Sequence, residues 1–156
     1  MVPEGEAKMN LGFYVDSLGE SQENDKIYDL LDDCVAKNKV HDASLFYNDI
    51  NFNRRTNSKF GIFNSTDIWA FTGTLICEGM GNIKRALSVV NKFKPIYLFK
   101  EEKINLVSFM DITSEVEVIT RTDQDADTVY RLTGKRPHLF KDWSLDNIIE
   151  VLECQT

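Results

Sequence analysis

The chain has 156 residues, 42% of them hydrophobic, which is enough to bury the core of one globular domain. No hydrophobic run approaches the roughly 20 residues that a membrane-spanning helix needs. The formal net charge of −7 disfavours nonspecific nucleic-acid binding, because such binding requires Lys and Arg side chains that displace counterions from phosphates.

The first half of the chain alternates short apolar segments with polar ones. From Asn24 to about Lys39, hydrophobic residues recur at spacings of three and four, which predicts a helix. Ser65 or Thr66 is the predicted cap of a single helical turn. The other expected elements are strands at residues 11–15, 43–48 and 60–63, the helical turn at 66–71, and a strand or helix start at 73–77.

The second half contains the clearest pattern of the chain. Residues 116–120 are rich in β-branched side chains, which suit a strand, and Thr122 or Asp123 is placed to cap the helix that follows. Gly134 is the expected end of that helix, and Pro137 introduces another strand. This βαβ unit is typical of a parallel sheet. The other expected elements are a strand at 95–99 and helices at 83–93, 101–110 and 145–152.

Strands and helices therefore alternate along the chain, and this alternation predicts the fold. We expect a doubly wound, mostly parallel, Rossmann-like α/β sheet of six or seven strands with helices on both faces. The expected organisation is an N-terminal extension at 1–9, a single domain at 10–153 and a C-terminal tail at 154–156. The polar, acidic N-terminus is unlike a secretory signal, which indicates the cytosol of a cell or of an infected host.

In open parallel sheets, ligands bind beyond the carboxyl ends of the strands. Asp16 and Ser17 follow the first predicted strand, and Arg121 follows a later one. The run Asn64-Ser65-Thr66-Asp67 follows a buried strand at the start of a helical turn, where free N–H groups can hold a polar ligand or the side chains can simply cap the turn. These seven residues are the predicted ligand-binding residues.

Other arrangements of metal-binding or anion-binding residues are less favoured. Asp16 and Asp49 follow neighbouring predicted strands, where two carboxylates can bind a divalent metal, but chance pairs are expected among 25 acidic residues. Gly79 and Gly81 could hold an anion, although no G-x-G-x-x-G or phosphate-loop motif is present. The three cysteines are widely spaced and contain no C-x-x-C pair, which argues against a zinc site. We therefore predict no metal and no cofactor.

Three segments together resemble small proteins of T4-like marine bacteriophages, chiefly cyanophages. They are Phe-Asn-Ser-Thr-Asp-Ile-Trp-Ala-Phe-Thr-Gly-Thr-Leu-Ile at 63–76, Asn-Lys-Phe-Lys-Pro-Ile-Tyr-Leu-Phe at 91–99 and Tyr-Arg-Leu-Thr-Gly-Lys-Arg-Pro at 130–137. The resemblance implies a protein of the infected host cytoplasm or of the virion.

A second resemblance concerns architecture. Val-Ile-Thr-Arg-Thr-Asp at 118–123, followed by Leu-Thr-Gly-Lys-Arg-Pro at 132–137, is similar to the last βαβ part of the N-terminal half of GT-B glycosyltransferases. Those enzymes bind the sugar nucleotide mainly through a second domain, for which 156 residues leave no room. The resemblance therefore implies a nucleotide-sugar binding module or a half-enzyme with another use, and it assigns no catalytic residue.

The motifs of catalysis are missing, so the leading hypothesis is a non-catalytic phage accessory or virion-associated protein. It would act through contacts with a protein partner or with further copies of itself. Trp69, Phe71 and Trp143 are the predicted interface residues, because they are aromatic and are expected to be exposed. The alternative is a binding module for a nucleotide or nucleotide sugar that uses the seven polar residues.

Overall fold

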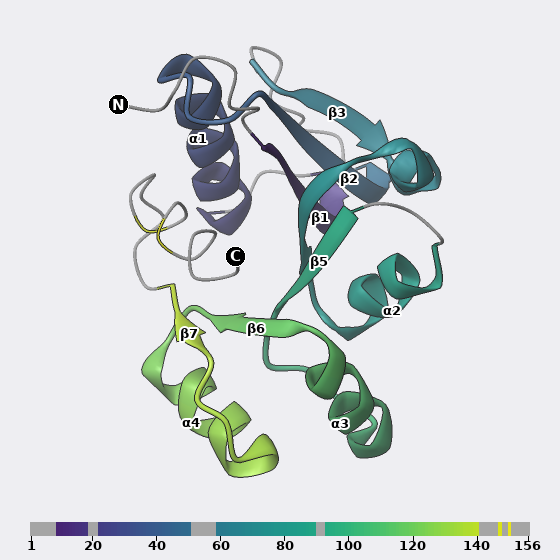
Figure 1. Ribbon diagram of the computed structural model, residues 1–156, viewed down its shortest axis with the longest axis vertical. Helices are drawn as coiled ribbons and strands as arrows, with labels where there is room; N and C mark the ends of the chain where they lie inside the picture. Colours follow the sequence, from purple (N-terminus) through teal and green to yellow (C-terminus); the bar gives the residue numbers. More distant parts are fainter. Residues whose placement is uncertain are drawn as a thin grey trace.

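The computed structural model describes residues 9–18, 22–50, 59–89 and 93–140, together with Asn147 and Glu150. Seven strands lie within these residues: β1 Asn10–Leu18, β2 Asp42–Ile50, β3 Gly61–Asn64, β4 Gly73–Glu78, β5 Phe93–Leu98, β6 Glu117–Thr120 and β7 His138–Leu139. They form one sheet in the order β3-β2-β1-β4-β5-β6-β7, and every neighbouring pair is parallel (Figure 1).

Helices cover both faces of this sheet, which confirms the predicted doubly wound, Rossmann-like fold. They are α1 Gln22–Ala36, the 3-10 helix η1 Ser65–Ala70, α2 Met80–Ser88, α3 Leu106–Glu115 and α4 Asp123–Thr133. Figure 1 shows α1 and α2 on opposite sides of the central strands. The proposed boundaries at 1–9, 10–153 and 154–156 stay predictions, because most residues at both ends lie outside the described part of the chain.

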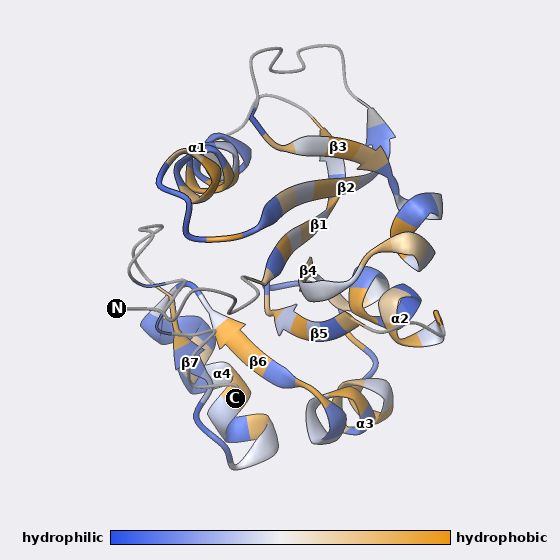
Figure 2. Ribbon diagram, turned by 45° about the horizontal axis from the view of Figure 1, so that its top comes forward, coloured by the Kyte–Doolittle hydropathy of each residue, from blue (hydrophilic) through white to orange (hydrophobic). Residues whose placement is uncertain are grey.

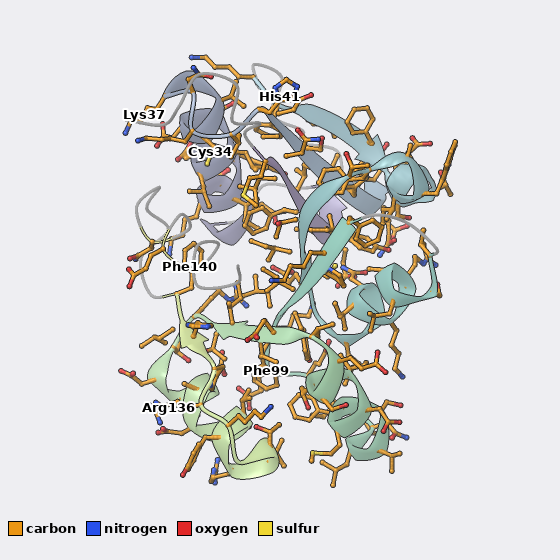
Figure 3. All side chains as sticks on the ribbon, in the orientation of Figure 1. Cys34, Lys37, His41, Phe99, Arg136 and Phe140 are labelled. Atoms are coloured by element: carbon orange, nitrogen blue, oxygen red, sulfur yellow. The ribbon has the colours of Figure 1, made fainter. Side chains whose placement is uncertain are left out.

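The core has two parts because side chains alternate between the two faces of a strand. On β1, Phe13 belongs to the cluster packed under α1, whereas Tyr14 belongs to the cluster on the α2 face. Figure 3 labels Cys34 and Phe140, which are buried in the first cluster, and Phe99, which is buried in the second. Hydrophobic residues run along β1, β2 and β6 in Figure 2, as strands covered on both faces require.

The observed ends of α4 are those predicted from the sequence. The Thr122 side chain accepts a hydrogen bond from the Asp125 N–H, and Gly134 ends the helix with a φ of 76°. A left-handed cap of this kind favours glycine, which has no Cβ.

Three sequence-based assignments need correction. Asn64, and neither Ser65 nor Thr66, caps η1 by accepting from the Thr66 N–H. The helix expected at 101–110 begins at Leu106, because Asn105 caps it, and continues to Glu115. The helix expected at 83–93 occupies Met80–Ser88, and residues 73–77 lie in a strand. The helix predicted at 145–152 lies, apart from Asn147 and Glu150, outside the described residues.

Candidate functional site

The strand order reverses between β1 and β4, and this switch point is where ligands bind in many open α/β sheets. Polar side chains converge beyond the carboxyl ends of the strands there, on the α2 face. They form a set that we call the carboxyl-end network: Tyr14, Asp16, Asn48, Ser65, Glu78, Asn82, Arg85 and Lys100.

Asn82 is the buried centre of this network, with 3% of its surface exposed. Its Nδ2 donates to the Glu78 carbonyl oxygen at 2.9 Å and to the Tyr14 carbonyl oxygen at 3.4 Å. Its Oδ1 accepts from Asn48 Nδ2 at 2.9 Å. The Tyr14 hydroxyl in turn donates to Asn48 Oδ1. Asn82 therefore joins α2 to β1, β2 and β4, and both ends of its amide are bonded.

Arg85 extends the network from α2 to η1. Its Nη1 lies 3.2 Å from Asn48 Oδ1 and 3.1 Å from Ser65 Oγ. A guanidinium that donates to two oxygen acceptors fixes both of them in place. Arg85 thus holds the start of η1 against the second strand.

Lys100 supplies the other positive charge of the network. Its Nζ lies 3.0 Å from Asp16 Oδ2 and 3.9 Å from Glu78 Oε1. Burial lowers the pKa of Lys100, but the hydrogen bond and charge of Asp16, with the charges of Glu78 and Glu102, raise the pKa above its ordinary value. The lysine is therefore held in its charged form.

The start of α2 is occupied by a carboxylate of the same chain. Gly79, the N-cap, has a φ of 86° and no side chain to cap the helix. Instead, Glu102 Oε1 accepts from the Met80 N–H at 2.6 Å. A negative charge is stabilised at this end of a helix by the free N–H groups. The anion position considered for Gly79 and Gly81 is thus filled by Glu102.

The structure brings together only some of the seven predicted ligand-binding residues. Asp16 and Ser65 belong to the carboxyl-end network, whereas Asn64 serves as a helix cap. Arg121 follows β6, which β4 and β5 separate from β1. The others also lie apart from the network: Ser17 on the opposite side of β1 from Asp16, Thr66 exposed on η1, and Asp67 at a cavity described below.

Sequence reasoning did not select Asn82, Arg85 or Lys100. Lys100 is the second residue after β5, so its position beyond a strand end was a usable signal. Asn82 and Arg85 lie inside a helix, and their distant partners come from the packing of α2 against β1, β2 and η1.

The carboxylates of Asp16 and Asp49 do not form a pair. Ser17 is level with Asp49 in the sheet, so Asp16 lies level with Asn48, whose Nδ2 is 3.5 Å from Asp16 Oδ1. A shift of one residue puts the two Asp side chains on opposite faces. Among the described residues, no three His, Cys, Asp or Glu side chains are grouped to hold a metal ion.

No residue of the carboxyl-end network lines any of three surface cavities, of about 400, 160 and 580 Å³, formed by the described part of the chain. In the same residues, no helix combines the length and hydrophobicity needed to cross a membrane.

The cavity of about 400 Å³ lies on the same face of the sheet but toward the amino ends of the strands. Asn10 and Asp42 are the first residues of β1 and β2, and η1 lies beside edge strand β3 (Figure 1). The only helix in the crossover from β3 to β4 is the six-residue η1, which covers less of the sheet than a longer α-helix would. We call this feature the aromatic cavity; it is lined by Asn10, Asp42, Ser44, Phe46, Phe63, Asp67, Ala70, Phe71 and Thr72.

Three phenylalanines form the apolar wall of the aromatic cavity. The ring centroid of Phe46 lies 5.8 Å from that of Phe63 and 5.5 Å from that of Phe71. Gly12 makes room for Phe71, since a Cβ at position 12 would lie 2.9 Å from Phe71 Cζ. A glycine in the first strand therefore shapes a cavity between distant elements.

The predicted interface residues differ in exposure. Trp69 is 68% exposed and Phe63, at the cavity, is 42% exposed. Phe71 is buried, with 8% exposed, because its ring packs across Gly12 and against Phe46, so the expectation that it is exposed was wrong. Trp143 lies outside the described residues.

The polar side of the aromatic cavity is negatively charged. Asp42 and Asp67 line it, and its nine residues include no Lys, Arg or His. Asn10 Nδ2 donates to Thr72 Oγ1 at 3.3 Å, whereas Asn10 Oδ1 is buried without a hydrogen-bond donor among the described residues. Chemically, the cavity offers aromatic rings, carboxylates and neutral oxygen acceptors.

No family model matches this chain, and no curated protein or solved structure is detectably similar to it.

Proposed function

We propose that this chain is a non-catalytic accessory or virion-associated protein of a bacteriophage that acts through protein–protein contacts. The aromatic cavity and the exposed ring of Trp69 form its contact surface. The cell in which it acts is the infected host, and the phage assignment rests on the sequence resemblance of residues 63–76, 91–99 and 130–137.

One observation carries this proposal: an aromatic-lined cavity of about 400 Å³ includes the partly exposed Phe63 and lies close in the sequence to the largely exposed Trp69. Aromatic rings dominate the energetics of protein interfaces because they bury a large area with little loss of conformational freedom. An apolar side chain at 68% exposure contributes little to the stability of the fold. These features favour a surface that is completed by another protein.

The carboxyl-end network gives less support to the alternative, a binding module for a nucleotide or nucleotide sugar. Its side chains bond to one another across the switch point, and Glu102 occupies the α2 start where a phosphate would bind. The alternative stays a prediction, and a nucleotide that binds at Asp16 and Ser65 would revive it.

A displayed library of random peptides tests the proposed function. Wild-type protein is used for selection, and bound peptides are then assayed against the double variant Phe63→Ala, Trp69→Ala. The control is Val107→Ala, Met110→Ala, which removes exposed apolar side chains from α3 instead. We expect the selected peptides to bind the first variant at least tenfold more weakly than wild type. Their affinity for the control variant should be unchanged.

The opposite pattern would overturn the proposal. If no peptide is selected, or if affinity depends on α3 and is indifferent to Phe63 and Trp69, the aromatic cavity is not the contact surface. Sedimentation of the wild-type chain over a hundredfold range of concentration tests whether the chain associates with further copies of itself. If the partner is a second copy, the measured mass should rise with concentration. That rise should disappear in the Phe63→Ala, Trp69→Ala variant.

A further inference from the structure

We infer that the aromatic cavity binds an arginine side chain supplied by a partner protein. This inference rests on the proposed function and identifies the chemistry of the residue that the cavity recognises. It follows from the combination of charge, aromatic surface and unused hydrogen-bond acceptors in one place.

The charge of the cavity is unbalanced. Asp42 Oδ1 accepts only the N–H of its neighbour Ala43, and neither Asp42 nor Asp67 forms an ion pair with the described residues. By contrast, Asp16 pairs with Lys100 and Asp127 pairs with Arg136. Two carboxylates at one cavity without a basic residue favour a cationic ligand.

The aromatic wall narrows the choice of cation. The planar guanidinium of arginine stacks on aromatic faces and is more weakly hydrated than an ammonium, so it enters an aromatic pocket at a lower desolvation cost than lysine. The three methylene groups of arginine also suit the apolar side formed by Phe46, Phe63 and Phe71. A volume of about 400 Å³ lies in the range of sites that enclose small groups.

The acceptors of the cavity match the donors of a guanidinium. Arginine carries five N–H donors and no acceptor. Asn10 lines the cavity, and its buried Oδ1 receives no hydrogen bond from the described residues, which leaves a costly acceptor without a donor there. Asp42, Asp67 and the hydroxyl of Ser44 add further acceptors around the same space. The net charge of −7 would also draw a basic partner toward the protein.

Calorimetric titration with N-acetyl-arginine amide tests the inference, with N-acetyl-citrulline amide as the uncharged analogue of nearly the same shape. We expect millimolar binding of the arginine compound and at least tenfold weaker binding of the citrulline compound. Asp67→Asn should weaken arginine binding at least threefold, because it removes one carboxylate from the cavity. The control Asp111→Asn, on the exposed side of α3, should leave it unchanged.

Equal affinity for arginine and citrulline, or insensitivity to Asp67→Asn, would overturn the inference. The peptide selection separates this failure from failure of the proposed function. Peptides that depend on Phe63 and Trp69 but are not enriched in arginine would refute arginine recognition and leave the protein-contact function standing. If no peptide is selected, the proposed function itself fails. A dimer that Asp67→Asn dissociates would identify a second copy as the occupant and would overturn the assignment to a foreign partner.

Discussion

The carboxyl-end network and the aromatic cavity lie on the same face of one sheet, yet their polar groups are paired in different ways. In the network, Arg85 and Lys100 donate to side chains of neighbouring elements, and the amide of Asn82 is bonded at both ends. In the cavity, Asp42 and Asp67 have no basic partner among the described residues. A convergence of polar residues therefore does not by itself indicate a ligand site, and the groups left without a partner are more informative.

Asn82→Ala gives the largest expected effect, because it breaks the network at its buried centre. The variant removes the donors to the carbonyl oxygens of Tyr14 and Glu78 and the acceptor for Asn48. Buried groups left unsatisfied cost about 1–3 kcal/mol each, partly offset by relaxation, so we expect a loss of about 2–3 kcal/mol. Urea unfolding measures it.

Gln124→Ala is the matched control, because Gln124 is an exposed amide residue on α4. It should change the unfolding free energy by less than about 0.5 kcal/mol. If Asn82→Ala were as mild as this control, the network would not be a structural element of the fold, and its polar groups would again be candidates for ligand binding.

Gly12→Ala should disturb the aromatic cavity, because the added methyl group would collide with the Phe71 ring. The added Cβ would lie 2.9 Å from both Phe71 Cζ and Leu75 Cδ1. Overpacking of this kind costs about 1–3 kcal/mol, and displacement of the Phe71 ring should weaken binding of N-acetyl-arginine amide. Urea unfolding and calorimetric titration measure the two effects.

Gly81→Ala is the control for the added methyl group. A Cβ at Gly81, in α2, has no atom within 4 Å. Helix propensity then predicts a gain of up to about 1 kcal/mol. A Gly12→Ala variant that is as stable as wild type and binds the probe normally would show that the close contact with Phe71 does not shape the cavity.

Lys100→Gln should give the smallest effect and the only one that depends on pH. The pKa of Lys100 is raised in the folded protein, so its charged form contributes stability that is fully present below roughly pH 10.4, the ordinary pKa of lysine. That stability is lost as the pH rises through the folded pKa. Since Asp16 is mostly exposed, we expect a difference of about 0.5–1 kcal/mol at pH 8 that shrinks above pH 10.4.

Urea unfolding of wild type and Lys100→Gln at pH 8 and pH 11 checks this sign. A difference between the two proteins that grows with pH would mean that Asp16 and Glu78 do not stabilise the lysine charge. Lys135→Gln is a suitable control, because Lys135 is exposed just after the end of α4.

Most of the fold followed from local signals in the sequence. The caps of α4 and the β-branched run of β6 lie close together along the chain, so periodicity and turn chemistry located them. The start of α3 was misplaced because Ile104 lies three residues before Val107 and so continues the helical spacing upstream of the helix. The helix in fact begins after its cap, Asn105.

The aromatic cavity did not follow from such signals, because no short segment contains it. Its residues come from β1, β2, β3, η1 and the two residues after η1, and only the sheet order β3-β2-β1 brings them together. Phe71 was expected to be exposed, and its burial depends on the missing side chain of Gly12, which lies far from it in the sequence. Only Asp67 was selected from the sequence among the lining residues that carry a charge.

The most direct test of the contrast between the two regions is to map the binding of N-acetyl-arginine amide by two-dimensional amide NMR. Our account predicts that the largest chemical-shift changes fall at the aromatic cavity, on Ser44, Phe63 and Thr72. Changes centred on Asp16, Asn48 and Lys100 would contradict it, because they would place the ligand at the carboxyl-end network that the protein fills with its own side chains.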